Sequence, residues 1–204
     1  MSEQVIVIGA GGHGKVIADI VRSSGDTVLG FLDDSPNRPE TVCDIPVLGG
    51  TKDYVNYPEA RFVIAIGNAE VRRTVAERLA GVKWYTAIHP DATVSPMGTE
   101  IGEGTVIMAG AVVNPCAHIG RHCIINTKAG VDHDNRLGDY THISVGATLA
   151  GTVTVGQAVW IGAGAVVSNN VSVCAGCMIG AGAVVVRSIE DPGTYVGVPA
   201  RKIK

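Results

Sequence analysis

His133 and Asp134 are adjacent residues whose types suit acid–base chemistry. An imidazole titrates near neutral pH, and a carboxylate beside it holds its tautomer and raises its basicity. Gly151 follows His133 by eighteen residues and could place a backbone N–H near the ring. A base beside an unobstructed N–H donor is the minimum apparatus for acyl transfer, because one group removes a proton and the other stabilises the oxyanion. The alternative is that His133 is an ordinary exposed residue, and the spacing alone leaves both interpretations open.

The interval of eighteen residues matters because the second half of the chain repeats every six residues. From Ile101 to Val185 every sixth residue is aliphatic, and a second series, from Thr105 to Ala183, is small almost throughout. One large and one small inward residue per six predicts a left-handed parallel β-helix of hexapeptide repeats, with three short strands and eighteen residues per coil. Gly151 should therefore stack on His133, and neighbours such as His133 and Asp134 can share one side only at a corner of the coil.

The first 80 or so residues have a different pattern, in which short apolar runs alternate with amphipathic helical stretches. We predict strands over 5–8, 28–32 and 62–66 and helices over 15–23 and 70–79. Three prolines break the stretch between the second and third strands; they are Pro36, Pro39 and Pro46. The sequence therefore predicts a half-Rossmann-like α/β domain over residues 1–85, followed by the β-helix domain over residues 86–204.

A glycine-rich turn, Gly9-Ala-Gly-Gly-His-Gly14, follows the first predicted strand. This spacing, with an acid about 20 residues later, is the dinucleotide fingerprint, but a full dinucleotide site uses two βαβαβ halves and only one fits before the hexads begin. We expect the turn and the helix N-terminus after it to bind the phosphates of a nucleotide sugar. Asp33 and Asp34 could then accept hydrogen bonds from ribose hydroxyls or base N–H groups. A tight turn without a ligand is the alternative.

The composition argues against several classes of protein. The 204 residues carry a formal charge of -3, which gives no basic surface for nucleic acid. The apolar runs are much shorter than the ~20 residues of a membrane span, and no targeting signal is recognisable, so we expect a cytoplasmic protein without a membrane partner. The pair Cys174 and Cys177 has no second pair or suitably spaced histidines near it, so no metal is expected.

Several motifs, each weak alone, occur together in one order. They read Gly-Gly-His-Gly-Lys after the first strand, Leu32-Asp33-Asp34, Ile64-Ala-Ile-Gly-Asn68, Ile88-His-Pro90, Val131-Asp-His-Asp134, His142-Ile-Ser-Val-Gly-Ala147 and Gly197-Val-Pro-Ala-Arg201. Taken together they resemble the sugar O- and N-acyltransferases of the sialic acid O-acetyltransferase type, whose nearest branch is the bacterial nucleotide-amino-sugar N-acetyltransferases. The resemblance covers nearly the whole chain.

The resemblance implies an acetyl-CoA-dependent N-acetyltransferase that acts on a nucleotide-linked amino-deoxy sugar, with UDP-4-amino-4,6-dideoxy sugars as the expected class. It also implies a homotrimer with clefts between neighbouring β-helices. His133 would be the general base and Asp134 its partner, where many relatives have Glu. The residues expected to bind the nucleotide sugar are Gly11, Gly12, His13, Asp33, Asp34 and Gly67, with Asn126 lining the active site. The residues expected to contact acetyl-CoA are His142, Gly151, Ala163 and Ala181.

Three other functions stay open at this point. A hydroxyl acceptor needs the same base, so O-acetylation of a sialic acid is one alternative. A non-catalytic nucleotide-binding trimer is the second, with His133 as a solvated corner residue. The third is a zinc enzyme of the γ-carbonic anhydrase kind with His118, His122 and His142 as ligands. It is disfavoured because His118 and His142 lie four hexads apart and so fall on different faces of the coil.

Overall fold

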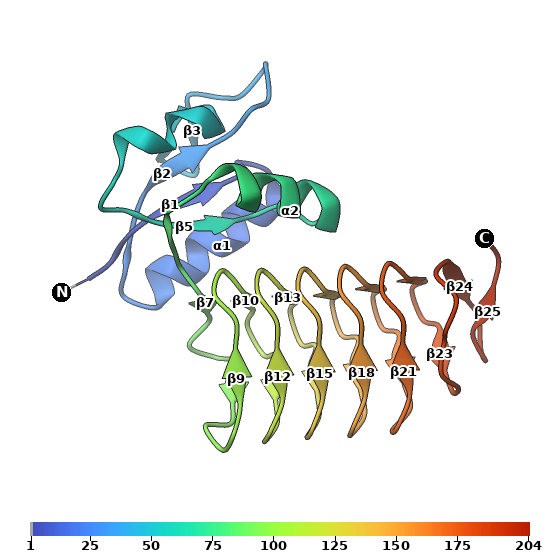
Figure 1. Cartoon of the computed structure of the whole chain (residues 1–204). Helices are drawn as coiled ribbons and strands as arrows, with labels where there is room; N and C mark the ends of the chain where they lie inside the picture. Colours follow the sequence, from blue (N-terminus) through green and yellow to red (C-terminus); the bar gives the residue numbers. More distant parts are fainter. Residues whose placement is uncertain (1) are drawn as a thin grey trace. The chain divides into compact units, whose positions relative to one another are not determined.

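The computed structural model describes residues 2–204, which form two compact units over residues 2–90 and 91–204 (Figure 1). The first unit is an α/β domain and the second is a parallel β-helix. Among the described residues, no helix has both the length and the apolar character that crossing a membrane requires.

The first unit is built on a six-stranded sheet with the order β3-β4-β2-β1-β5-β6. Every neighbouring pair is parallel except the β3–β4 hairpin. The elements are β1 (Gln4–Ile8), α1 (Gly12–Ser23), β2 (Thr27–Leu32), β3 (Thr41–Val42), β4 (Ile45–Gly49), the 3-10 helix η1 (Thr51–Asn56), β5 (Arg61–Ile64), α2 (Ala69–Arg78), β6 (Lys83–Trp84) and β7 (Ala87–Ile88). The chain passes from β1 to β2 on one side and later to β5 on the other, so the strand order reverses beside β1.

Apolar residues of the central strands and helices form the core of this unit. One cluster comprises Ile6, Ile8, Leu32, Ala60, Phe62, Ile64, Val75 and Leu79. Helix α1 packs closely on β1 because Gly14 has no side chain: a Cβ there would lie 2.1 Å from the carbonyl oxygen of Gly9. The last glycine of the turn therefore allows the helix to pack closely on the strand.

The stretch that the prolines were predicted to break contains more structure than expected. It holds the β3–β4 hairpin, in which Pro46 pairs with Thr41, and the 3-10 helix η1. A proline is tolerated there because β3 is a two-residue strand at the edge of the sheet, where few ladder hydrogen bonds are required. Strand β5 ends at Ile64, two residues earlier than predicted.

The second unit is a regular stack of two-residue strands. From β8 to β23 the strands are β8 (Thr93–Val94), β9 (Glu100–Ile101), β10 (Val106–Ile107), β11 (Val112–Val113), β12 (His118–Ile119), β13 (Ile124–Ile125), β14 (Gly130–Val131), β15 (Arg136–Leu137), β16 (His142–Ile143), β17 (Thr148–Leu149), β18 (Thr154–Val155), β19 (Trp160–Ile161), β20 (Val166–Val167), β21 (Ser172–Val173), β22 (Met178–Ile179) and β23 (Val184–Val185). From β9 to β20 each strand pairs in parallel with the strand eighteen residues later, as in Gly130 with Thr148, whereas β8 pairs with β11 at an interval of nineteen residues.

Three sheets form the faces of the coil, and Figure 1 shows one of them as the row of arrows β9, β12, β15, β18 and β21. We call this row the third sheet. The first sheet contains β7, β10, β13, β16, β19 and β22, extended by the C-terminal strands β24 (Thr194–Val196) and β25 (Arg201–Lys202), and the second contains β8, β11, β14, β17, β20 and β23. The small inward series from Thr105 to Ala183 is buried throughout, and the aliphatic series is buried from Ile107 to Val185, so the predicted fold is confirmed.

The last coil departs from the repeat. Met178 of β22 pairs with Thr194 of β24 (Thr194–Val196), an interval of sixteen residues. Strand β25 (Arg201–Lys202) then turns back antiparallel to β24. The hairpin gives the final edge of the first sheet a partner, which a parallel stack cannot provide for itself.

Candidate active site

His133 and Asp134 form a turn at the corner between the second and third sheets, after β14 and before β15. The His133 Nδ1 atom lies 2.7 Å from Asp134 Oδ2, and both side chains are exposed. Asp134 adopts a left-handed backbone with φ 60°, which redirects the chain so that the two neighbours meet. This hydrogen bond is the main reason that the pKa of His133 is raised above its usual value, and it leaves Nε2 as the nitrogen available for chemistry.

Gly151 stacks on His133 in the next coil, as the eighteen-residue period predicts. A Cβ at Gly151 would lie 2.5 Å from His133 Nε2, so only glycine leaves room for the ring in this place. Among residues 2–204, no acceptor is found for the Gly151 N–H. His133 Nε2 therefore lies close to the backbone of Gly151, whose N–H is a candidate donor for an oxyanion. We call His133, Asp134 and Gly151 the histidine corner.

His142 and Asn126 lie on the first sheet. The Asn126 Nδ2 atom is 3.1 Å from His142 Nε2, and the His142 ring stacks on Trp160 with 5.1 Å between centroids. Trp160 Nε1 in turn donates to Ser144 Oγ at 2.7 Å. Trp160 and Ser144 were not anticipated from the sequence, although both lie one coil from predicted residues and the period could have indicated them.

Ala163 and Ala181 lie one above the other at the corner between the first and second sheets, after β19 and β22. Both are exposed, and within the described chain neither N–H has a hydrogen-bond acceptor. Exposed N–H groups in a column of small residues can bind the carbonyl and phosphate oxygens of a long ligand. We call Ala163 and Ala181 the alanine corner.

The two corners are distinct. Ala163 has the same place in its hexad as Gly151, but twelve residues separate the two and turn the chain through two faces of the coil. The sequence therefore grouped residues that one β-helix does not bring together. His142 and Asn126 lie on the first sheet, which borders the alanine corner, whereas the histidine corner stands at the far edge of the second sheet.

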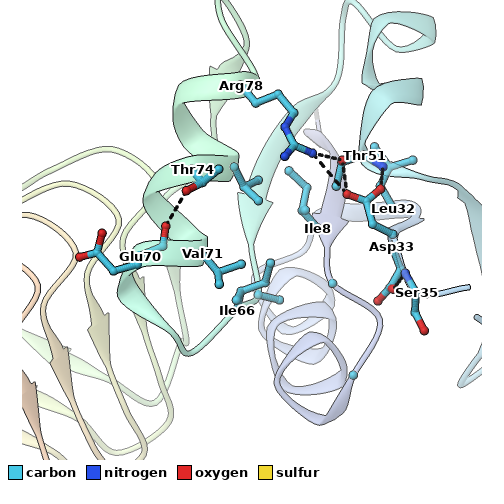
Figure 2. Close-up of a pocket in the computed structure, with 15 residues that line it drawn as sticks. Ile8, Leu32, Asp33, Ser35, Thr51, Ile66, Glu70, Val71, Thr74 and Arg78 are labelled. Atoms are coloured by element: carbon cyan, nitrogen blue, oxygen red, sulfur yellow. Dashed lines mark hydrogen bonds and ion pairs between the residues drawn. The ribbon is translucent and has the colours of Figure 1, made fainter.

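The first unit holds a cavity of about 540 Å³ at the carboxyl ends of β1, β2 and β5, where the strand order reverses (Figure 2). Ligands of open α/β sheets bind at such switch points. Gly11, Asp33 and Asp34 line it, whereas Gly12, His13 and Gly67 do not. The remaining lining residues, which were not predicted, are Ile8, Gly9, Leu32, Ser35, Thr51, Ala65, Ile66, Glu70, Val71, Thr74, Val75 and Arg78.

The predicted carboxylates of Asp33 and Asp34 both accept hydrogen bonds from other residues of this unit. Asp33 accepts from the N–H groups of Ala10 and Ser35, each at 2.7 Å. Asp34 accepts from the Thr51 N–H at 2.7 Å and from the Thr51 hydroxyl at 2.6 Å, and Arg78 of α2 reaches toward this pair across the cavity (Figure 2). The Thr51 hydroxyl is the main reason that the pKa of Asp34 is lowered. Each carboxylate oxygen has a second lone pair, so both residues can still accept from a ligand.

Glycine at positions 11, 12 and 67 is not required by the fold. A Cβ at Gly11, Gly12 or Gly67 would meet nothing within 4 Å, and none of the three has a positive φ. Gly11 is the N-cap of α1 and supplies no side-chain cap, so the first N–H groups of this helix are open to an anion. The open space suits a phosphate group close to the backbone.

His13 lies inside the first turn of α1, mostly buried, and its Nε2 atom has no hydrogen-bond partner. Burial, and secondarily the nearby Arg72, lowers the pKa of His13 to about 4. The ring is therefore neutral at physiological pH and cannot act as a cation for phosphate.

Within residues 2–204, no group of three or more His, Cys, Asp or Glu side chains is arranged to hold a metal ion. His118 lies on the third sheet and His142 on the first, so the geometry that disfavours a zinc site with these ligands is present. Cys174 and Cys177 are free thiols whose sulfur atoms lie 3.3 Å apart.

Both parts of the chain match known families. Residues 4–79 match the PglD N-terminal domain, and residues 98–133 and 152–187 match the bacterial transferase hexapeptide repeats. UDP-N-acetylbacillosamine N-acetyltransferase of Bacillus subtilis is 43% identical over 121 residues, a match that spans 52% of this chain and 52% of that protein. GDP-perosamine N-acetyltransferase of Escherichia coli O157:H7 is 33% identical over 73% of this chain and 71% of its own length.

Solved structures show the same architecture. The acetyltransferase domain of PglB from Neisseria gonorrhoeae, in complex with acetyl coenzyme A, superposes with a TM-score of 0.93 at 39% identity and covers 100% of both chains. PerB from Caulobacter crescentus, in complex with CoA and GDP-perosamine, gives a TM-score of 0.92 at 38% identity and covers 98% of this chain and 97% of its own.

Proposed function

The chain belongs to the hexapeptide-repeat nucleotide-sugar N-acetyltransferases with a PglD N-terminal domain, and we propose that it transfers acetyl from acetyl-CoA to the amine of a nucleotide-linked amino-deoxy sugar. UDP-linked 4-amino-4,6-dideoxy sugars are the proposed acceptors. The B. subtilis relative, which is named for a UDP-linked sugar, supports this choice, whereas the E. coli and C. crescentus relatives are named for GDP-perosamine.

The observation that carries the proposal is the histidine corner. Asp134 holds Nδ1 of His133, which leaves Nε2 to take a proton from the sugar amine. The neutral amine nitrogen attacks the thioester carbonyl and gives this proton to Nε2 as the N–C bond forms, and the Gly151 N–H stabilises the resulting oxyanion. Collapse of the tetrahedral intermediate breaks the C–S bond, and the protonated His133 returns its proton to the leaving thiolate. No covalent acyl-enzyme is needed, because base and donor act on two substrates bound together.

The cavity of the first unit is the proposed site of the nucleotide sugar. Its place at the switch point, the open glycines at positions 11 and 12 and the carboxylates of Asp33 and Asp34 suit a phosphate-linked nucleoside. Neutral His13 and Gly67 border the same glycine-rich turn and strand end, and we assign them to the support of this site.

The alanine corner is the proposed path of acetyl-CoA, with the thioester toward His142 and Asn126. Because one β-helix carries the histidine and alanine corners on different edges, a complete site requires a corner from each of two copies. This supports a homotrimer with its sites in the clefts between subunits, since closed cyclic symmetry repeats the same pair of corners in every cleft.

The test is release of CoA, followed with a thiol reagent. The acceptor panel contains UDP-, GDP- and CMP-linked 4-amino-6-deoxy sugars together with free sialic acid. We expect turnover of one amino sugar, and a fall of about 10²–10⁴-fold for His133→Ala at an unchanged melting temperature. Turnover of sialic acid alone would show O-acetylation instead. Nucleotide-sugar binding without turnover of any acceptor would support a non-catalytic trimer, and full activity of His133→Ala would disprove the assignment of the base.

A further inference from the structure

Asp132 lies immediately before the proposed base and is fixed in place by two hydrogen bonds. Its Oδ1 atom accepts from Asn114 Nδ2 of the preceding coil at 2.8 Å and from the N–H of His133 at 2.8 Å. These bonds, with Asn114 contributing most, hold the pKa of Asp132 below its usual value. Asp132 is therefore ionised at neutral pH and adds a second negative charge at the histidine corner.

The same turn is also fastened from inside the coil. Asn135 is fully buried in the small inward series, where alanine is the most frequent residue. Its Nδ2 atom donates to the Asp132 carbonyl at 2.9 Å, and its Oδ1 atom accepts from the Val153 N–H at 2.6 Å. Asp132 is thus tied to the preceding coil by its side chain and to the following coil through Asn135. A buried amide whose donor and acceptor are both bonded specifies one geometry for the turn.

A neighbouring hexad shows that this turn does not need a carboxylate. Asn126 has the hexad position of Asp132, six residues earlier, and its Oδ1 atom accepts from the Thr127 N–H at 2.8 Å. An amide therefore makes the same backbone contact. The charge of Asp132 is additional to what the turn requires, and the carboxylate that carries it is bonded to the backbone N–H of His133, from where it acts electrostatically on the imidazole.

We propose that Asp132 is a positioning residue of acetyl transfer: it fixes the turn that presents His133 and places a second carboxylate beside the imidazole. This inference rests on the proposed role of His133 as the base. A second carboxylate stabilises the imidazolium that forms when the sugar amine loses its proton, so the base is stronger than with Asp134 alone.

Few other groups face the turn. The residues stacked on it are Asn114, Pro115 and Cys116 in the preceding coil and Ala150, Gly151 and Thr152 in the following coil, and of these only the Cys116 thiol can titrate. The Cys116 sulfur lies toward Gly98 in the coil before it. The charges that act on His133 from its own turn are therefore those of Asp134, which contributes most through its hydrogen bond, and of Asp132.

The test compares Asp132→Asn, which keeps the turn and removes the charge, with Asp132→Ala, which removes both. For Asp132→Asn we expect the acid limb of the kcat/KM profile to move down by about 0.3–0.7 pH unit, because exposed charges act through water. We expect its plateau kcat to fall about threefold to tenfold, with both KM values within about twofold. Asp132→Ala should lose about tenfold more, since the His133 N–H also loses its acceptor.

Asp44→Asn is the matched control, because Asp44 is exposed, adopts a left-handed backbone that asparagine tolerates and changes the net charge equally. Its pH profile should equal that of the unmodified protein. If the acid limb of the kcat/KM profile did not move in Asp132→Asn, Asp132 would have only a structural role. If the KM for the amino sugar rose while kcat stayed unchanged, Asp132 would contact the substrate instead. An NMR titration of the His133 ring in Asp132→Asn gives the same pKa comparison without turnover, so the inference can fail independently of the proposed reaction.

Discussion

One histidine in each unit has a pKa that differs from the usual value of imidazole, and the two pKa values are shifted in opposite directions. His13, in the α/β unit, is mostly buried beside Arg72, and its pKa falls to about 4. His133, in the β-helix, is exposed beside carboxylates, and its pKa rises. The contrast teaches that position in the fold, and not residue type, decides which histidine can serve as a base: one is kept neutral by desolvation, whereas the other is made more basic by its neighbours.

The first effect that would sharpen this contrast concerns stability. A histidine with a lowered folded pKa binds protons more readily when unfolded, so stability is lost as the pH falls from 6.5 toward 4. We expect the α/β unit to lose about 2 kcal/mol between pH 7 and pH 5 from His13 alone. Urea unfolding checks this, with Trp84 fluorescence as the reporter in a Trp160→Phe background. A His13→Gln variant should lose that part of the pH dependence, and an unchanged slope in this variant would contradict the burial of a neutral ring.

The second effect concerns the histidine corner. A methyl group at Gly151 would lie 2.5 Å from His133 Nε2, so Gly151→Ala should displace the ring without removing any ionisable group. We expect kcat to fall about 100-fold, which is typical of a displaced base or a lost oxyanion donor. Steady-state kinetics at saturating substrates measure this. Gly176→Ala is the control for a glycine-to-alanine change in another turn, where a Cβ meets no neighbour, although the positive φ costs alanine some stability. Equal activity of Gly151→Ala and the unmodified protein would show that the stacking is irrelevant to catalysis.

The smallest effect concerns the glycine-rich turn. Gly11→Ala has open space around its Cβ and an unstrained φ, so we expect the melting temperature to stay within about 2 °C. The KM for the nucleotide sugar should nevertheless rise about tenfold, because the methyl group occupies the space proposed for a phosphate. Gly14→Ala is the opposite case, since its Cβ would press on the Gly9 carbonyl and should destabilise the unit. If Gly11→Ala left the KM unchanged, the phosphate would have to lie elsewhere.

The sequence predicted the β-helix well because a strict repeat is a local and redundant signal. The eighteen-residue period alone placed Gly151 on His133 and put His118 and His142 on different faces. The pattern did not distinguish the histidine corner from the alanine corner, because Ala163 and Gly151 have the same position in their hexads. They lie at different corners because two hexads, and therefore two faces of the coil, separate them. The role of Asp132 was also not predicted: the period places Asn114 one coil before it, but the hydrogen bonds that Asp132 accepts depend on side-chain orientation, which the period does not give.

The α/β unit was harder to predict in detail. Strands and helices followed from apolar patterning, but Pro46 concealed the β3–β4 hairpin because prolines ordinarily interrupt strands. Thr51 and Arg78 line the cavity from a 3-10 helix and from the far end of α2, and no local motif marks either residue. The two carboxylates were correctly placed at the end of β2, whereas their bonds to the Ala10 and Thr51 backbone depend on tertiary structure.

The regular coil also limits how the length of this protein can change. Adding or removing eighteen residues would shift every later strand by one coil, about 4.8 Å along the axis, and return each side chain to its own face. Adding six residues before the alanine corner would advance the rest of the chain by one face and carry the alanine corner to the edge that now bears histidine, whereas removing six would move it back to the edge between the third and first sheets. The length of this β-helix can therefore change only by whole coils, because any smaller change would move every later side chain to a different face.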